Sequence, residues 1–161
     1  MDKRLQHIIT LRENGQLEEA NQLMVALVQE QPENGYYQFH CAWTYDSLGK
    51  EKDAVPHYEK AIQLVLDPEI LVAAYLGLGS TYRTLGQYEQ SKRIFEKALS
   101  EFPEAEHLKV FYAMTLYNLS EHSKAMETLL NIVIQTTNHK EIKDYSKAIK
   151  FYSDKLDQTW E

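Results

Sequence analysis

Apolar residues recur three and four positions apart along almost the whole chain, which is the spacing of one face of an α-helix. The β-branched residues never alternate with polar residues over more than a few positions, so no strand is expected. The six glycines and four prolines punctuate the helical stretches without clustering into a linker. The pattern therefore predicts an all-α protein that forms a single domain over residues 1–161.

The helical stretches also repeat, with a period of about 34 residues. In each of four segments a turn residue stands five positions before a small residue, and a bulky residue follows four positions after the small one. The turn residues are Gly15, Gly49, Gly86 and Ser120, the small residues are Ala20, Ala54, Ser91 and Ala125, and the bulky residues are Met24, Tyr58, Phe95 and Leu129. This period divides the chain into repeats at 1–34, 35–68, 72–105 and 106–139.

An insertion at 69–71 and a tail at 140–161 lie outside the four repeats. Just before the insertion, Asp67 precedes Pro68, and a carboxylate followed by proline is a typical helix start, so we expect a helix from about Pro68 to Leu85. In the tail, a stripe of apolar residues predicts one capping helix over 140–158; its members are Ile142, Tyr145, Ile149, Tyr152 and Leu156. A terminal helix with a polar outer face would cover the last hydrophobic face of the repeats.

The third repeat resembles the tetratricopeptide repeat most closely. The residues that carry this resemblance are Tyr75, Leu78, Gly79, Tyr82, Gly86, Tyr88, Phe95, Ala98 and Pro103. In that family, small residues at set positions let two antiparallel helices approach closely, and the first helices of successive repeats line a concave groove that holds ligands. The resemblance implies an α-solenoid of four helix pairs that ends in the C-terminal capping helix.

Composition and charge exclude several classes of function. The chain carries 17 basic and 24 acidic residues, a net charge of −7 that disfavours nucleic acid as a partner. No apolar run reaches the about 18 residues that span a membrane, and the first residues lack the apolar stretch of a secretory signal. We therefore expect no membrane contact and a cytoplasmic location, with which the single cysteine, Cys41, agrees.

The sequence offers no pattern that would support catalysis. It contains none of the phosphate-binding, dinucleotide-binding, zinc-protease or serine-hydrolase motifs. The soft metal ligands are six histidines and Cys41, and the neighbours His40 and Cys41 point to different faces of a helix. We therefore expect no enzyme activity, no cofactor and no metal site, and we expect Cys41 to be a buried thiol.

The positions that line the groove in this family hold two aromatic walls here, one in the second repeat and one in the fourth, with mostly small side chains between them. This contrast predicts an apolar pocket over the third repeat, where aromatic anchors would bind a partner. The expected binding residues are Tyr36, Phe39, His40 and Trp43, then Leu76, Gly77 and Arg83, and finally His107, Phe111, Met114 and Tyr117.

A packing interpretation of the same residues stays open. A glycine inside a helix costs roughly 1 kcal/mol relative to alanine, so a neighbour or a partner should need the room beside Gly77. Trp43 can fill that room, and Phe111 can pack against the tail. Our hypothesis is a non-enzymatic protein-interaction module that binds a peptide segment of a partner protein in the aromatic groove.

Two alternative functions follow from the same fold. The first is a scaffold that self-associates, with a homodimer as its simplest form, through an exposed N-terminal edge of Leu5, Ile8 and Ile9. The second is a receptor for a small signalling peptide, which would bind in the groove and raise the melting temperature.

Overall fold

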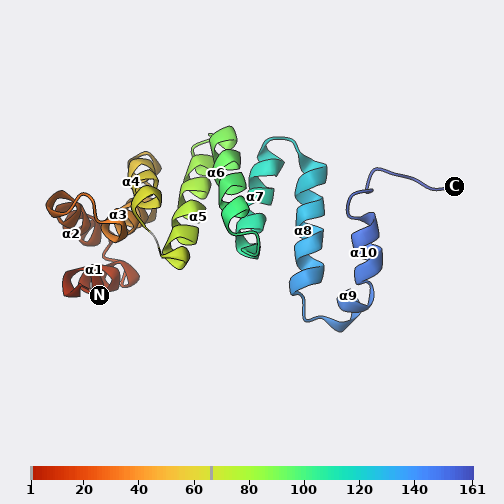
Figure 1. Cartoon of the computed structure of the whole chain (residues 1–161), viewed down its shortest axis with the longest axis horizontal. Coiled ribbons are helices and arrows are strands. Elements are labelled where there is room, and N and C mark those ends of the chain that lie inside the picture. The colour runs from red at the N-terminus through yellow and green to blue at the C-terminus, as the bar shows by residue number, and fades with distance from the viewer. Residues whose placement is uncertain (1, 66) are drawn as a thin grey trace. The chain divides into compact units, whose positions relative to one another are not determined.

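The computed structural model describes residues 2–65 and 67–161, and every regular element in these ranges is a helix (Figure 1). The helices are α1 (Lys3–Glu13), α2 (Leu17–Glu30), α3 (Gly35–Ser47), α4 (Glu51–Leu64), α5 (Pro68–Thr84), α6 (Tyr88–Glu101), α7 (Glu106–Asn118), α8 (His122–Thr136), α9 (Lys140–Asp144) and α10 (Ser146–Tyr152). The all-α prediction is confirmed for these residues. The chain divides into two compact units, and the boundary lies inside α6, between Ile94 and Phe95.

Short polar side chains begin three of the helices. Asp2, Asn34 and Asp67 accept hydrogen bonds from backbone N–H groups in the first turns of α1, α3 and α5. Each bond satisfies a donor that has no partner inside the helix. Pro68 occupies the first helical position of α5, and α5 ends at Thr84, so the predicted helix from about Pro68 to Leu85 is confirmed.

One conformation ends the first helix of all four repeats. Gly15, Gly49 and Gly86 follow α1, α3 and α5 with φ angles of 80°, 68° and 74°, and Ser120 follows α7 with a φ of 62°. This left-handed region suits glycine because glycine has no Cβ. A serine at this φ has a steric clash between its Cβ and the backbone. The turn after α7 is therefore strained, whereas the glycine turns of the other three repeats are not.

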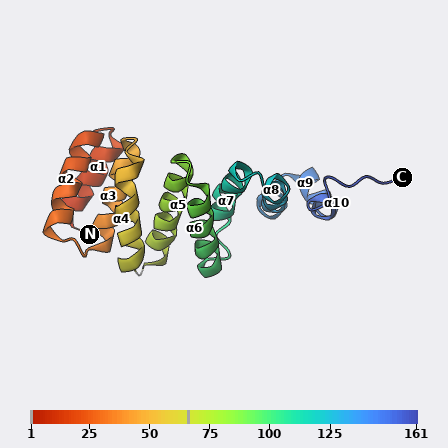
Figure 2. The same cartoon turned by 90° about the horizontal axis from the view of Figure 1, so that it is seen from above.

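The first core lies between α1, α2 and α3, which pack together at the N-terminal end of the chain (Figure 2). Leu5, Ile8 and Leu11 of α1 are buried in it, against residues such as Met24 of α2. The prediction that Leu5 and Ile8 form an exposed apolar edge is therefore wrong, because both side chains face α2 and α3. The exposed residues of α1 are all polar: Lys3, Arg4, Gln6, His7, Thr10 and Glu13.

The second core joins α3, α4 and α5. Phe39 of α3, Tyr58 of α4 and Leu78 of α5 are buried in it, and Ile94 of α6 packs against it. Ser91 stands where the other repeats have alanine, and it is fully buried. Its hydroxyl donates a hydrogen bond to the Gly79 carbonyl over 2.7 Å, so the serine is satisfied at this close crossing.

The C-terminal unit has its own core, to which the end of α6 contributes Phe95 and α7 contributes Leu108, Tyr112 and Leu116. No described helix in either unit is long and apolar enough to cross a membrane.

The tail differs from the prediction of one helix over 140–158. It forms two short helices, α9 and α10, and the residues after Tyr152 are not helical. The buried Ser153 ends α10 by donating its hydroxyl to the Lys150 carbonyl over 2.8 Å. The chain then turns back to α8, where the Ser123 hydroxyl donates to Asp157 over 3.4 Å. A straight helix through residue 158 would not make this return contact.

Replacing Ser120 by glycine is expected to raise the free energy of unfolding by about 1 kcal/mol, because glycine adopts this φ without a Cβ clash. Gly86→Ser should lower it by a similar amount. Urea denaturation followed by circular dichroism measures both changes. Ser100→Gly, in the exposed part of α6, is the matched control and should lower stability, as glycine does inside a helix. If Ser120→Gly also lowers stability, the strain at this turn is not real.

Candidate functional site

The most open aromatic surface of the N-terminal unit is one face of α3. Tyr36, His40 and Trp43 lie on it because residues four and then three positions apart share a helix face. Tyr36 and Trp43 are 43% and 42% exposed, which is high for large aromatic side chains in a packed unit. We call these three residues the α3 face. Its neighbours are α1 on one side and α5 on the other.

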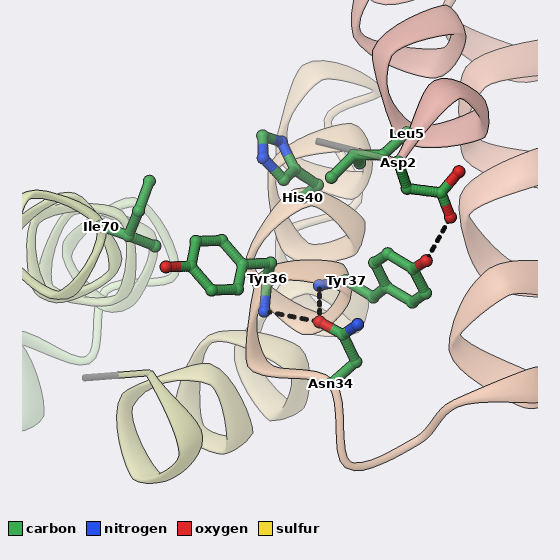
Figure 3. Close-up of a pocket in the computed structure, with 7 residues that line it drawn as sticks. All are labelled: Asp2, Leu5, Asn34, Tyr36, Tyr37, His40 and Ile70. Carbon is green, nitrogen blue, oxygen red and sulfur yellow. Dashed lines mark hydrogen bonds between the residues drawn. The ribbon is translucent and has the colours of Figure 1, made fainter. Parts of the chain in front are cut away.

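A pocket of about 420 Å³ opens beside the first turns of α3 (Figure 3). Its lining consists of Asp2 and Leu5 from the start of the chain, Asn34, Tyr36, Tyr37 and His40 around the first turns of α3, and Ile70 of α5. Figure 3 shows Tyr36 pointing across to Ile70, whereas Tyr37 points the other way, to Asp2. The volume lies in the range of small-ligand sites, about 300–1,000 Å³.

A hydrogen bond between α3 and the N-terminal residues holds one wall of this pocket. The Tyr37 hydroxyl donates to Asp2 over 2.5 Å, and Asp2 also accepts from the Arg4 backbone N–H. The Tyr37 bond lowers the pKa of the Asp2 carboxyl, and the same bond raises the pKa of Tyr37. The Asp2 carboxyl at the pocket is therefore ionised, and it already accepts hydrogen bonds from Tyr37 and from the Arg4 backbone.

His40 is the polar group of the pocket that has no partner. It is about nine-tenths buried, and its Nδ1 atom makes no hydrogen bond with any described residue. Burial, together with the nearby positive charge of Arg12, lowers the pKa of His40 to about 4. The imidazole is therefore neutral near pH 7, and its unpaired Nδ1 atom is shielded from solvent.

Trp43 is exposed on one side but held on the others. The Arg12 guanidinium of α1 lies 3.5 Å from the centre of its ring, which is a close cation–π contact. The His40 ring lies nearly parallel to it at 6.2 Å, and the Phe39 ring packs at 5.6 Å. These contacts fix the indole before any partner arrives, so binding would cost little further side-chain entropy.

Tyr58 of α4 fills the room beside Gly77. A Cβ added at Gly77 would overlap the Tyr58 ring, and Tyr58 cannot move aside easily because its hydroxyl donates to Asp46 over 2.7 Å. The Thr81 hydroxyl also lies near Asp46, at 3.1 Å. Burial raises the pKa of the Asp46 carboxyl, and burial next to Asp46 raises that of Tyr58. The room beside Gly77 is thus occupied by Tyr58 and not by Trp43.

The other expected binding residues are scattered. In the N-terminal unit, Phe39 is buried, while Leu76 and Arg83 are half-buried and Arg83 already interacts with another residue. In the C-terminal unit, Phe111 of α7 is half-buried, and the exposed residues of that helix are His107, Met114 and Tyr117. The structure therefore brings Tyr36, His40 and Trp43 together as one surface, and the buried Phe39 ring packs against His40 and Trp43.

Five residues of the pocket are absent from the expected binding set: Asp2, Leu5, Asn34, Tyr37 and Ile70. Ile70 lies in the insertion, which the repeat numbering leaves without a groove position. The early start of α5 at Pro68 was the signal that could have found it, since the extra turn places Ile70 opposite Tyr36. Tyr37 faces α1 rather than solvent, which helix periodicity alone does not reveal.

The thiol and the histidines offer no assembled chemical site. Cys41 is fully buried, as expected, and burial raises the pKa of its thiol to about 12, so it is not a thiolate. Among the described residues, no three or more histidine, cysteine, aspartate or glutamate side chains are placed to share a metal ion.

Comparison with known proteins agrees with the repeat pattern. The sequence model of the family described as Tetratrico peptide repeat matches residues 35–156. A curated relative, the human protein O-mannosyl-transferase TMTC1, is 29% identical over 93 residues, which cover 58% of this chain and 10% of that protein. The chain spans at most 10% of the length of the first curated relatives that it matches.

Solved structures share the fold at low sequence identity. The crystal structure of MamA has a TM-score of 0.72 and 17% identity, covering 95% of this chain and 93% of that one. YrrB, described as a TPR protein with an unusual peptide-binding site, has a TM-score of 0.70 and 14% identity, covering 94% of this chain and 77% of that one. These likenesses confirm the repeat solenoid as the fold.

Gly77→Ala is expected to lower the free energy of unfolding by about 2 kcal/mol, because the new methyl group overlaps the fixed Tyr58 ring. In a Tyr58→Ala background the same change should raise it, by up to about 1 kcal/mol, since alanine favours the helix once the room is free. Thermal unfolding of the four proteins in this cycle measures both effects. The same sign in both backgrounds would show that Tyr58 is not the reason for the glycine.

Stability should fall as the pH is lowered from about 6.5 to about 4. The pKa of His40 is about 4 in the folded chain, against 6.5 ordinarily, so in this window the unfolded chain binds a proton that the folded chain does not. The contribution of His40 is complete above pH 6.5 and is lost toward pH 4, by roughly 3 kcal/mol at most.

The control for this pH dependence is a pair of variants compared by urea denaturation across the window. His40→Gln should flatten the slope, because glutamine does not titrate. His107→Gln removes an exposed imidazole of α7 and is the matched comparison. Equal slopes in the wild type and in His40→Gln would contradict the buried, neutral state of His40.

Proposed function

The chain belongs to the tetratricopeptide repeat family, a protein-interaction fold, and from this we propose that it binds a peptide segment of a partner protein on the α3 face. The observation that carries the proposal is the pair of exposed aromatic side chains, Tyr36 and Trp43, beside a pocket of about 420 Å³. Aromatic anchors next to a pocket are typical of the residues that dominate binding energy. The proposed role is non-enzymatic.

The pocket favours an uncharged, apolar side chain of the partner. Leu5, Tyr36 and Ile70 supply its apolar walls, and the charge of Asp2 is already balanced by hydrogen bonds and by Arg4 at 3.6 Å. A charged side chain in this pocket would lose water without gaining an opposite charge. An aliphatic or aromatic side chain would instead exchange solvent for the walls of the pocket.

The partner's backbone would meet His40 and Trp43. The Nδ1 atom of His40 is buried and has no hydrogen-bond partner among the described residues, so the ring would have to turn before it could bond to a peptide N–H or carbonyl. Trp43, held under Arg12, presents a flat apolar surface one helical turn further along α3. The net charge of −7 would favour the approach of a segment that also carries basic residues.

This mode of binding agrees with the comparisons but does not rest on them. YrrB, which shares the fold, is described as having a peptide-binding site. The exposed residues of α7 and of the C-terminal tail are not needed for the proposed interaction. Every residue of the α3 face and of its pocket belongs to the N-terminal unit.

Short random peptides displayed on phage, selected against the full chain, should yield binders that depend on the α3 face. Trp43→Ala and Tyr36→Ala are each expected to weaken these peptides by about tenfold or more, because each removes an aromatic anchor. Isothermal calorimetry of the synthetic peptides measures the loss. Leu23→Ala is the matched control, since Leu23 is similarly exposed, at 39%, but lies on α2 and does not line the pocket.

Fluorescence gives a second measurement of the same interaction. The chain has two tryptophans, Trp43 and Trp160, so a Trp160→Phe variant reports Trp43 alone. Its emission should shift when a selected peptide binds. Peptides that bind the Trp43→Ala and Tyr36→Ala variants as tightly as the wild type, or a selection that yields no binder, would contradict the proposal.

A further inference from the structure

We propose that the C-terminal unit carries a self-association surface, at which two copies of this chain join to form a dimer. The surface consists of exposed apolar residues on α8, on α10 and on the segment after α10. It is independent of the α3 face, which belongs to the other unit. We call it the tail surface, and its members are Met126, Leu129, Val133, Tyr145, Phe151, Tyr152, Leu156 and Trp160.

The first observation is a comparison of equivalent positions in the four repeats. The bulky residue four positions after the small one is at most 3% exposed in the first three repeats, where it is Met24, Tyr58 or Phe95. In the fourth repeat it is Leu129, which is 37% exposed. In the first two repeats α3 and α5 pack over this position, and in the third the Tyr112 ring of α7 packs against Phe95. The broken helices α9 and α10 do not cover Leu129 in the same way.

Leu129 is part of a stripe rather than an isolated exposure. Met126 and Val133, three positions before and four positions after it, are exposed on the same face of α8. In the earlier repeats the corresponding face of the second helix is a packing surface. The last repeat therefore ends in an apolar face that this chain's own tail leaves open.

The second observation is an aromatic cluster on the neighbouring element. Phe151, Tyr152 and Trp160 pack against one another, with ring centres 5.1 to 6.3 Å apart, yet each stays about half exposed. The contacts hold the three rings in place without burying them. α10 packs against α8, so this cluster and the α8 stripe lie on elements that touch.

The amount of apolar surface is sufficient for a stable interface. An aromatic side chain offers about 150–250 Å², and the eight members of the tail surface are each roughly half exposed, so together they present on the order of 700 Å². A stable interface buries about 800 Å² on each partner, and the largest apolar patch of a typical monomer is about 300–600 Å².

Charge favours a second copy as the occupant. Residues 140–161 contain five lysines and five acidic residues, so this segment is neutral and carries both signs. The net charge of −7 therefore belongs entirely to the rest of the chain, where two copies would repel each other. A surface that carries equal numbers of lysines and acidic residues can face an identical surface, because the lysines of one copy can pair with the acidic residues of the other.

The outward face of α1 does not match the tail surface. The outward residues of α1 are polar, and Leu5 and Ile8 are buried, so an apolar tail surface finds no matching surface there. Head-to-tail contacts, which would build a filament, are therefore disfavoured. An isologous contact, in which the tail surface meets its own copy, buries apolar side chains on both sides and closes the assembly.

Sedimentation velocity of the full chain, from about 1 to about 200 μM, tests the proposal. The expected result is a reversible dimer at twice the chain mass of 18.8 kDa. Leu129→Glu and Phe151→Glu should each raise the dissociation constant by about tenfold or more, because each places a charge in the interface. Leu23→Glu is the matched control: Leu23 has nearly the same exposure as Leu129, at 39%, but lies on α2.

A second readout keeps the test independent of any one variant's folding. In a Trp43→Phe variant the fluorescence reports Trp160 alone, and its emission should move to shorter wavelength as the concentration rises. Circular dichroism shows whether each glutamate variant keeps its helices. Both side chains are exposed in the single chain, so the fold should tolerate the change.

Three results would overturn the proposal. A wild type that keeps the 18.8 kDa mass at every concentration would assign the tail surface to a different occupant, such as a foreign protein. Equal weakening by Leu23→Glu would show that the association is not specific to the tail. A series of growing oligomers would rule out the closed, isologous contact. None of these results bears on peptide binding at the α3 face, which phage selection tests separately.

Discussion

The close approach of paired helices at one small side chain is the constraint on which the rest of this structure depends. Ala20, Ala54, Ser91 and Ala125 occupy that position in the four repeats, and all are at most 5% exposed. Any larger side chain would separate the helices and open the cores beside them. Ser91 meets the constraint because its hydroxyl donates a hydrogen bond to the Gly79 carbonyl, and residue 79 has no side chain at this crossing.

This constraint sets the direction of the bulky side chains that follow. With the helices at a fixed distance, a residue four positions further along the second helix must project into the next repeat. Met24 and Tyr58 do so, and Tyr58 extends far enough to occupy the room that Gly77 leaves and to bond with Asp46. The second helices thus contribute these large side chains to the same cores that bury one side of α3, while Tyr36 and Trp43 of α3 stay exposed.

The α3 face is built so that few charges need to rearrange on binding. Asp2 is bonded to Tyr37, His40 is neutral, and Arg12 is stacked on Trp43. Burial lowers the pKa of Arg12, because part of the water around its charge is removed. A partner carbonyl or carboxylate near Arg12 would relieve this cost, so specificity on this face would come from hydrogen bonds around an apolar anchor.

The repeat pattern made most of the fold predictable, because it reports the spacing of residues along each helix. The turns at Gly15, Gly49 and Gly86, and the start of α5, follow from local chemistry. The repeat pattern could not predict which side chain fills each space between the helices. Whether Trp43 or Tyr58 fills the room at Gly77 depends on the reach of side chains from different helices, which spacing does not encode.

The two ends of the chain show the same limit. The apolar stripe of α1 and the apolar stripe of the tail look alike as patterns, yet Leu5 and Ile8 are buried whereas Tyr145 and Leu156 are exposed. The difference arises because α1 is one unbroken helix that packs on α2 and α3, while Ser153 ends α10 and sends the chain back toward α8.

The separation of the two surfaces has a consequence for binding strength. The α3 face and the tail surface share no residue and lie in different units, so dimer formation would not consume the peptide site. A dimer would then carry two peptide sites. A partner with two suitable segments would bind the second one at an effective concentration in the millimolar range for short flexible linkers. Weak contacts at each α3 face would thereby become a strong interaction only for partners that carry more than one segment.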